Sequence, residues 1–177
     1  MSRPEPPGEI VIAAYAVRPA IAADARSFLD LYALVVGEGR FIRTDHVHRS
    51  MRFYRKRLAS SWTPDDASIV AVAGDAVIGS LGITREEHPV TRHVASIGMM
   101  VHPDWRGRGV GSALMAKSLQ WAQEMGVEKV ALSVYPDNDA ARALYRKFGF
   151  VEEGRRVKQL RRSSGELWDV VDMGLLL

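Results

Sequence analysis

The chain of 177 residues contains no cysteine. Disulfide bonds, thiolate metal ligands and cysteine nucleophiles are therefore excluded from its chemistry. It also has no apolar run near the ~20 residues that a membrane-spanning helix requires. A surplus of charge is missing as well: 24 Lys and Arg against 21 Asp and Glu leave a net charge of +3, too small to indicate nucleic-acid binding. We therefore expect a cytoplasmic protein with neither a membrane nor a nucleic acid as partner.

The residues that are present have the composition of a globular protein, 47% hydrophobic and 25% charged. Residues 1–9 are polar and rich in proline, which predicts a flexible N-terminal tail, and the length of residues 10–177 suits one domain. Apolar runs rich in β-branched residues predict strands. These runs are Glu9–Val17, Ser68–Ala73, Ala76–Ile83, Val90–Val101, Lys129–Tyr135, Val151–Leu160 and Leu167–Leu175.

Apolar residues at spacings of three and four predict helices between these strands. The helices run from Asp24 to Gly37, from a cap at Thr44-Asp45 through Val47 to about Ala59, from Gly111 to Gly126, and from Asn138 or Asp139 to Gly149. Gly74-Asp75 between two strands predicts a hairpin turn, so Asp75 is a turn residue. The resulting order β, α, α, β, β, β, α, β, α, β, β predicts an α/β (α+β) domain with a mixed sheet.

The stretch from Val101 to Met115 (VHPDWRGRGVGSALM) carries glycine at positions 107, 109 and 111, between a strand and a helix. Glycine lets successive backbone N–H groups converge on one oxygen, and the start of the helix adds a positive dipole end. Arg106 and Arg108 would add charge. The stretch therefore predicts a phosphate or pyrophosphate site, although a turn without a ligand would have the same spacing.

Two common phosphate motifs do not fit this turn. The dinucleotide fingerprint needs a third glycine where Ser112 stands, and it belongs to the first strand of a βαβ unit. The triphosphate loop needs Gly-Lys-Ser/Thr, which is absent. A metal site is rejected as well, because His46 and His48 lack a third ligand nearby.

Basic residues repeat along the second helix, at Arg49, Arg52, Arg55, Lys56 and Arg57. A solvated helix face explains them, and an anionic partner is the alternative. Nucleic-acid binding through this segment or through Arg155 to Arg162 is disfavoured, because few aromatic residues lie between the basic ones.

The glycine turn resembles a known family signature. Arg106, Gly109 and Gly111 match the R/Q-x-x-G-x-G/A motif of the GCN5-related N-acetyltransferase (GNAT) family. Upstream, Met99 to Pro103 resembles the strand and turn before that motif. Downstream, LSVYPDNDAARALYRKFGFVEEG (Leu132 to Gly154) resembles the second conserved block of the family. The element order agrees from Ile10 to about Leu175, so the resemblance covers nearly the whole chain.

The resemblance implies acetyl-coenzyme A (acetyl-CoA) as acyl donor. It implies that the pyrophosphate is held by the residues Arg106, Gly107, Arg108, Gly109, Val110, Gly111 and Ser112. It also implies a mostly antiparallel sheet with helices on both faces and a splayed parallel strand pair. The pantetheine arm would enter between those strands and pair with Met99, Met100 and Val101. In the family, a bulge in this strand aims an N–H group at the thioester carbonyl.

Asn138 and Tyr145 are seven residues apart and lie on one face of the predicted helix. Taken alone, Asn138 reads as a helix cap and Tyr145 as a half-buried packing residue. The resemblance implies that Asn138 also contacts pantetheine and that Tyr145 protonates the departing thiolate. No cysteine exists to carry the acetyl group, so the acceptor amine is expected to attack directly in a ternary complex.

The general base and the acceptor stay open at this point. Glu38, Glu86, Glu87, His88 and His93 are candidates for the base, each with a solvated or packing role as the alternative. The acceptor is a primary amine of a small molecule or a peptide, bound near residues 37–44, 85–89 and 160–166. A non-catalytic CoA-binding regulatory module is the competing function, and a homodimer is a possible assembly.

Overall fold

A computed structural model of the chain describes residues 10–12, 14–44, 49–60 and 62–177. One sheet contains eight strands in the order β1-β2-β3-β4-β5-β6-β8-β7. The strands are β1 (Ile10–Ile12), β2 (Tyr15–Pro19), β3 (Asp66–Ala73), β4 (Ala76–Arg85), β5 (Val94–Val101), β6 (Lys129–Val134), β7 (Val151–Arg161) and β8 (Leu167–Leu176). The α-helices are α1 (Ala25–Gly37), α2 (Met51–Ala59), α3 (Val110–Glu124) and α4 (Asp139–Lys147).

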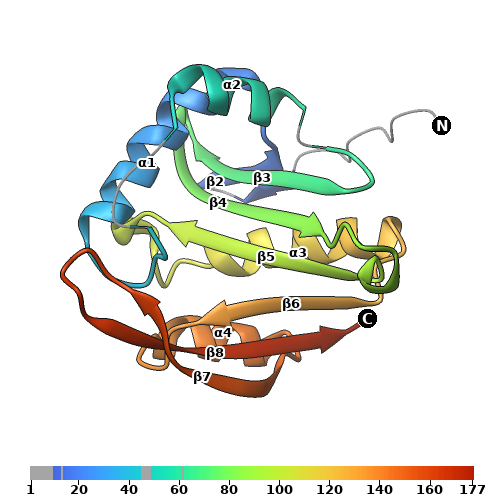
Figure 1. The fold of residues 1–177 in the computed structure, drawn as a ribbon. Coiled ribbons are helices and arrows are strands. Elements are labelled where there is room, and N and C mark those ends of the chain that lie inside the picture. The colour runs from blue at the N-terminus through green and yellow to red at the C-terminus, as the bar shows by residue number, and fades with distance from the viewer. Residues whose placement is uncertain (1–9, 13, 45–48, 61) are drawn as a thin grey trace.

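The helices cover opposite faces of the sheet, α1 and α2 on one and α3 and α4 on the other (Figure 1). Each face has its own core. Leu114 and Trp121 of α3 belong to the first core, and Leu31 of α1 to the second. In β5, Met99 packs against the first core and its neighbour Met100 against the second. Strand β5 is thus covered on both faces, as is typical of a central strand in an α/β sheet.

Strand pairing confirms the predicted mixed sheet with helices on both faces. Every neighbouring pair in the described sheet is antiparallel except β5 and β6, which are parallel. The hairpin predicted at Gly74-Asp75 is present, and β7 and β8 form a second antiparallel hairpin. No helix in the described part of the chain is long and apolar enough to cross a membrane.

The prediction of one strand over Glu9–Val17 is wrong. The segment folds into two antiparallel strands, β1 and β2, with Ile12 paired to Tyr15. Ala14 and its neighbours lack the glycine, proline or asparagine that mark turns, so this reversal could not be predicted from local residues. Residues 1–9, which include the predicted tail, lie outside the described residues.

Two further boundaries differ from the prediction. Helix α2 begins at Met51, where the Oγ of Ser50 accepts from the N–H of Phe53 at 3.3 Å; the predicted cap Asp45, together with His46, Val47 and His48, lies outside the described residues. Strand β5 begins at Val94, four residues later than predicted, because Pro89 opens a short 3-10 turn. Proline favours such a first helical position.

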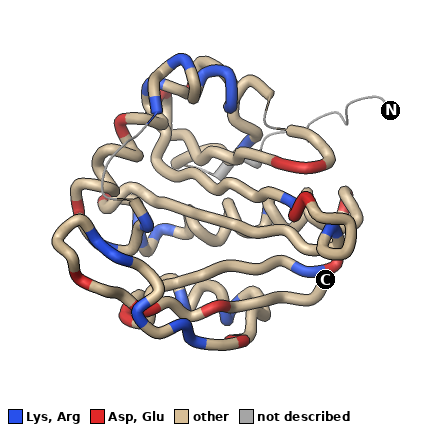
Figure 2. Tube along the Cα trace, in the orientation of Figure 1, with Lys and Arg blue, Asp and Glu red and all other residues tan. Residues whose placement is uncertain are grey.

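The basic residues of α2 face solvent, as the solvated-face interpretation predicted. Figure 2 shows Lys and Arg gathered on this helix. The side chains of Arg52, Arg55, Lys56 and Arg57 are exposed, while Tyr54 and Leu58 on the other side are buried. The helix therefore docks through a narrow apolar stripe.

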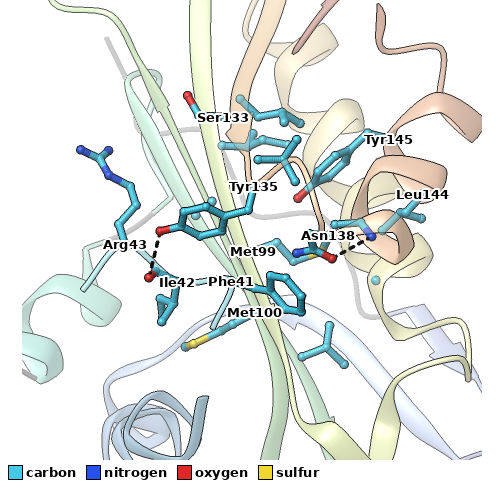
Figure 3. Close-up of a pocket in the computed structure, with 18 of the residues that line it drawn as sticks. Phe41, Ile42, Arg43, Met99, Met100, Ser133, Tyr135, Asn138, Leu144 and Tyr145 are labelled. Atoms are coloured by element: carbon cyan, nitrogen blue, oxygen red, sulfur yellow. Dashed lines mark hydrogen bonds between the residues drawn. The ribbon is translucent and has the colours of Figure 1, made fainter. Parts of the chain in front are cut away.

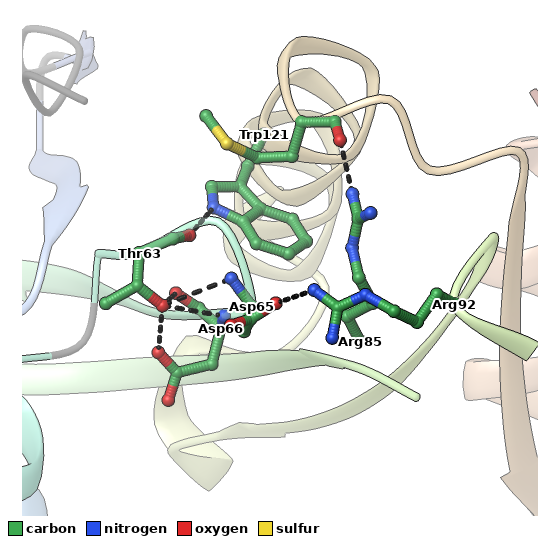
Figure 4. Close-up of polar contacts among 7 residues, drawn as sticks. Thr63, Asp65, Asp66, Arg85, Arg92 and Trp121 are labelled. Carbon is green, nitrogen blue, oxygen red and sulfur yellow. Dashed lines mark hydrogen bonds and ion pairs between the residues drawn. The ribbon is translucent and has the colours of Figure 1, made fainter. Parts of the chain in front are cut away.

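A polar cluster fixes the end of α3 that is remote from the glycine turn (Figure 4). The indole Nε1 of Trp121 donates to the carbonyl of Thr63 at 3.1 Å. The Oγ1 of Thr63 in turn donates to Asp66 at 2.8 Å. Arg85 donates to the carbonyl of Met125 at the end of α3. These contacts hold α3 against the start of β3 and the end of β4, and so set its direction.

Replacing Trp121 with Phe should lower the free energy of unfolding by about 2 kcal/mol. The substitution removes a buried hydrogen bond, leaves the Thr63 carbonyl without this donor and shortens a fully buried side chain. Urea unfolding followed by circular dichroism measures the change. The exposed Gln123 on the same helix, replaced by Ala, is the matched control; an equal loss in both variants would contradict this role for Trp121.

Candidate active site

Strands β5 and β6 separate soon after they begin. They pair at three positions, Val94 with Lys129, Ala95 with Val130, and Ser96 with Ala131. Beyond these positions both strands continue without pairing to each other. The separation leaves a gap bordered by backbone groups of two strands, and it confirms the splayed parallel pair.

The backbone of β5 turns alternate residues toward this gap. At the two ends of its ladder with β4, the N–H of Glu86 donates to the carbonyl of Val94 at 2.9 Å and the N–H of His102 to Ile78 at 2.8 Å. Successive residues of a strand direct their polar groups to opposite sides. The even-numbered residues therefore bond to β4, whereas Met99 and Val101 direct N–H and C=O groups toward the gap. These two residues can pair with an extended ligand.

The bulge that the resemblance implied is absent from β5. Its pairing with β4 runs in unbroken register from Arg85 opposite Ala95 to Gly79 opposite Val101. Met100 consequently bonds to β4 through its backbone. The regular alternation of β5 already directs backbone N–H groups into the gap, so no bulge residue is needed to supply a donor there.

The glycine turn opens helix α3 without a side-chain cap. Gly107 and Gly109 have φ of 72° and 83°, in the left-handed region that favours glycine. The first helical hydrogen bond runs from Ala113 N–H to the carbonyl of Gly109 at 3.0 Å. The N–H groups of Val110, Gly111 and Ser112 therefore have no acceptor within the helix. These three N–H groups form a potential anion-binding site.

Two other glycines bring α3 close to its neighbours. A Cβ on Gly79 of β4 would lie 2.8 Å from Cγ1 of Val110, and one on Gly111 would lie 3.0 Å from Cδ2 of Leu144. The start of α3 is thus pressed against both the sheet and α4. Gly111 serves this packing, while Gly107 and Gly109 serve the turn.

Both arginines of the glycine turn, Arg106 and Arg108, contact other residues of the protein. The guanidinium of Arg106 forms a two-pronged ion pair with Glu38, at 2.9 and 2.6 Å, and its Nε donates to the carbonyl of Val101. Its N–H donates to Pro103 at 3.2 Å. The guanidinium of Arg108 lies over the ring of Trp105, 5.4 Å from its centre. Arg108 is exposed at the open side of the turn.

Asn138 and Tyr145 enter the same cavity from α4 (Figure 3). Asn138 caps the helix as predicted, because its Oδ1 accepts from the N–H of Ala141 at 3.2 Å. That bond uses only the oxygen, so the amide nitrogen of Asn138 can serve a ligand. Tyr145 is buried beside Phe150, with its hydroxyl pointing into the cavity (Figure 3).

Burial raises the pKa of Tyr145 to about 12. An ionised phenolate would lose its hydration in this setting, so the neutral form is favoured. Tyr145 therefore keeps its proton at every physiological pH. It can donate a hydrogen bond to a group in the cavity.

The cavity has a volume of about 1490 Å³ and reaches through the gap to both faces of the sheet. On the α3 face it is lined by the glycine turn and α4. On the α1 face it is bordered by the segment between α1 and α2 and by strands β6 to β8. Gly82 and Gly98 stand opposite each other on its floor, and a Cβ on either would meet nothing within 4 Å. The volume exceeds that of most small-ligand pockets, which hold up to about 1,000 Å³.

The five candidate bases have different relations to this cavity. Glu38 lines it, but both its oxygens accept from Arg106. Glu86 accepts at 3.3 Å from the Oγ of Ser96, which lines the cavity. Glu87, His88 and His93 are exposed and are not among the lining residues. The Nδ1 of His88 accepts from Val90, so it caps the 3-10 turn.

Two contacts beside the cavity could not be predicted from the sequence. The hydroxyl of Tyr135 donates to the carbonyl of Ile42 at 3.1 Å, and the buried Arg162 donates to the same oxygen at 2.8 Å. Ser133 lies in β6 and Tyr135 directly follows the strand, so strand periodicity could have placed both on the face toward α1. The partners in the α1–α2 segment are 93 and 120 residues away in sequence and could not be foreseen. No group of three potential metal ligands occurs among the residues that the structure describes.

The comparisons with known proteins agree with this geometry. Residues 42–150 match the Acetyltransferase (GNAT) family. The chain is 35% identical over 127 residues to the L-amino acid N-acetyltransferase AaaT of Escherichia coli, covering 71% of this chain and 76% of that one. It is 37% identical over 117 residues to the N-alpha-acetyltransferase RimI of Mycobacterium tuberculosis, covering 65% and 69%.

Solved structures show the same fold. A GNAT-family acetyltransferase of Streptococcus pneumoniae superposes with a TM-score of 0.84 and 27% identity, covering 92% of this chain and 99% of that one. A phosphinothricin acetyltransferase of Sinorhizobium meliloti, solved with acetyl-CoA, gives 0.80 at 23% identity, covering 93% and 89%. Fold, glycine turn, splayed strands and relatives agree: the chain belongs to the GNAT family and is an acetyl-CoA-dependent N-acetyltransferase.

Proposed function

We propose that the protein transfers the acetyl group of acetyl-CoA to a primary amine of a small molecule or a peptide, by direct attack in a ternary complex. One observation supports the proposal above all others. The gap between β5 and β6, the uncapped start of α3 and the hydroxyl of Tyr145 open into one cavity. An anionic cofactor held at the turn can therefore place its acyl end between the strands.

The residues fit the parts of acetyl-CoA. The N–H groups of Gly107, Arg108, Gly109, Val110, Gly111 and Ser112 would hold the pyrophosphate, with the charge of Arg108 nearby. Met99 and Val101 would pair with the pantetheine arm, and Asn138 would contact its amides. In this proposal Arg106 has a structural role, because it binds Glu38 and the carbonyl of Val101 and so fixes the glycine turn.

Acetyl-CoA supplies an acyl carbon activated by its thioester bond and a thiol as leaving group. A backbone N–H of β5 that faces the gap donates to the acyl oxygen as its negative charge grows. Tyr145 donates to the departing sulfur. A phenol of pKa about 12 is a weaker acid than a thiol of about 8.5. Complete proton transfer would cost roughly 5 kcal/mol, so Tyr145 acts by hydrogen bonding before water supplies the proton.

The amine must lose its proton before it attacks. Of the five candidate bases, Glu86 has a hydrogen-bonded connection to the cavity, through Ser96. We assign it the role of proton acceptor by way of Ser96 and water. Glu38 is disfavoured because Arg106 already occupies both its oxygens.

The names of two relatives suggest where the acetyl group goes. One acts on L-amino acids and the other is an N-alpha-acetyltransferase. Both names describe transfer to nitrogen, and an α-amine is the acceptor that fits either. Release of thiol from acetyl-CoA across a panel of amines tests the proposal. Intersecting initial-velocity lines are expected for a ternary complex, and parallel lines would contradict direct attack.

Replacing Gly109 with Glu should weaken acetyl-CoA binding by about 100-fold or more. The new side chain would bring negative charge to the pyrophosphate site and a Cβ to 3.4 Å from the Tyr15 hydroxyl. Calorimetry with CoA measures the affinity. Gly74→Glu is the matched control, because Gly74 also has positive φ but lies in the β3–β4 hairpin and is not among the residues that line the cavity. Equal affinity in wild type and the Gly109 variant would refute the assignment of the turn.

Replacing Tyr145 with Phe should lower kcat by about 100-fold and change cofactor affinity little. The ring and its packing against Phe150 are kept while the donor is lost. Because the pKa of Tyr145 is raised to about 12, the wild-type rate should show no decline from its ionisation between pH 8 and about 10. Steady-state rates across pH measure both effects. An unaltered kcat in the variant would remove Tyr145 from the chemistry.

Replacing Glu86 with Gln should lower kcat/KM by about 10-fold at neutral pH, with a smaller loss at alkaline pH, where the amine is already neutral. Glu87→Gln is the control, because this neighbour has the same charge and exposure but does not bond to Ser96. The pH dependence of acetyl transfer measures the difference. Equal behaviour of the two variants would refute the role of Glu86.

A further inference from the structure

The segment between α1 and α2 is fastened across the cavity to the β7–β8 hairpin. The carbonyl of Ile42 accepts from Tyr135 and from Arg162, at 3.1 and 2.8 Å. Arg162 is 7% exposed and its guanidinium lies 4.4 Å from the centre of the Trp168 ring. Trp168 meets the ring of Tyr135 edge to face at 5.2 Å. The tip of the hairpin and this segment lie beside each other in Figure 1.

The same segment is held at its other end. Glu38 is bound by both prongs of Arg106, beside the glycine turn. Between the two anchors, Phe41 has φ of 59°, a conformation that costs energy for a residue with a side chain and persists only where contacts enforce it. The backbone at Ile42 and Arg43 is therefore set by the surrounding structure. Arg162 also reaches the carbonyl of Arg43, at 3.5 Å.

Arg43 is an exposed cation on the cavity wall, and no acidic residue in the described part of the chain pairs with it. Figure 3 shows its guanidinium standing clear of the other side chains drawn there. Among the residues that the structure describes, three acidic ones line the cavity, and each is in an ion pair: Glu38 with Arg106, Glu153 with Lys129, and Asp172 with Arg156. Arg43 and Arg57 line the same region and form no ion pair with any residue that the structure describes. The acceptor side thus has surplus positive charge.

Two consequences follow for the acceptor. The bridge from Ile42 to Tyr135 and Arg162 crosses the side of the cavity away from the glycine turn, which favours a compact acceptor over an extended polypeptide. The surplus positive charge favours an acceptor that carries an anionic group beside its amine. Positive charge also lowers the pKa of a nearby ammonium group, which helps to produce the neutral amine.

We propose that the acceptor is a small amine with a free carboxylate, of the amino-acid class, and that Arg43 binds that carboxylate. The planar guanidinium can hold two carboxylate oxygens at once. Arg162 and Tyr135 are positioning residues, because they fix the backbone from which Arg43 projects. The open floor at Gly82 and Gly98 leaves room for the rest of the molecule. This inference rests on the proposed acetyl transfer and selects between the acceptor classes that the two relatives suggest.

The test compares L-amino acids with their carboxamides, which keep the amine and the side chain but lose the negative charge. Wild type should use the acids at least about 10-fold better in kcat/KM. Arg43→Gln should lower kcat/KM for the acids by about 10- to 100-fold, mainly through KM, and leave the carboxamides unchanged. Arg43→Lys should recover part of the loss, since it restores the charge without the planar pair of donors.

The control is Arg55→Gln, an exposed residue of α2 outside the main cavity, which loses the same charge. It should alter neither the acids nor the carboxamides. Equal use of acids and carboxamides by wild type would overturn the inference, and so would an equal loss on both in Arg43→Gln.

A binding measurement separates this inference from the proposed function. Calorimetry with the amino-acid panel on the CoA-saturated protein reads acceptor affinity without any turnover. Carboxylate-dependent binding that Arg43→Gln abolishes supports the inference even if no thiol is released, in which case the proposed acetyl transfer alone fails. Binding that is equal for acids and carboxamides overturns the inference whatever the activity.

Discussion

Backbone N–H and C=O groups inside a sheet need partners, and the separation of β5 from β6 leaves those of Met99 and Val101 without a neighbouring strand. The features of the site follow from that opening. It creates a passage between the two faces of the sheet, with the glycine turn and Tyr145 on one side and the α1–α2 segment on the other. A ligand that enters the gap replaces the missing strand, so the same groups that make the sheet incomplete supply recognition. The ends of β5 and β6 that remain paired keep the opening fixed.

Much of the fold could be predicted because its signals are local. The glycine turn, the caps at Asn138 and Gly126, and the hairpin at Gly74-Asp75 each depend on residues next to one another. The turn between β1 and β2 was missed because no residue there restricts the backbone in a recognisable way. The start of α2 was misplaced because Thr44-Asp45 and Ser50 are equally good caps, and tertiary packing chooses between them.

The residues of the site could likewise be predicted where their signals are local. Gly109, Asn138 and Tyr145 could be found because they lie in continuous motifs, and the structure brings them to one cavity. The pairing of Arg106 with Glu38 joins residues 68 positions apart, so the sequence suggested a phosphate contact for one and a base for the other. Arg43 and Arg162 lie in the segments 37–44 and 160–166 that were expected near the acceptor, but the contacts of Tyr135 and Arg162 with Ile42 could not be predicted for the same reason. The partner of a charged side chain in a long-range contact cannot be predicted from the residues next to it in the sequence.

The floor at Gly82 and Gly98 has a consequence for how this enzyme can diverge. Neither glycine has the positive φ that would require it, and a Cβ added at either position would meet no atom within 4 Å. Most glycines in the site are constrained by turn geometry or by close packing, so changing them would damage the fold. At these two positions the methyl group of an alanine would fill only empty space. Copies of this gene could therefore acquire narrower acceptor preferences through single substitutions that leave stability and the cofactor site intact.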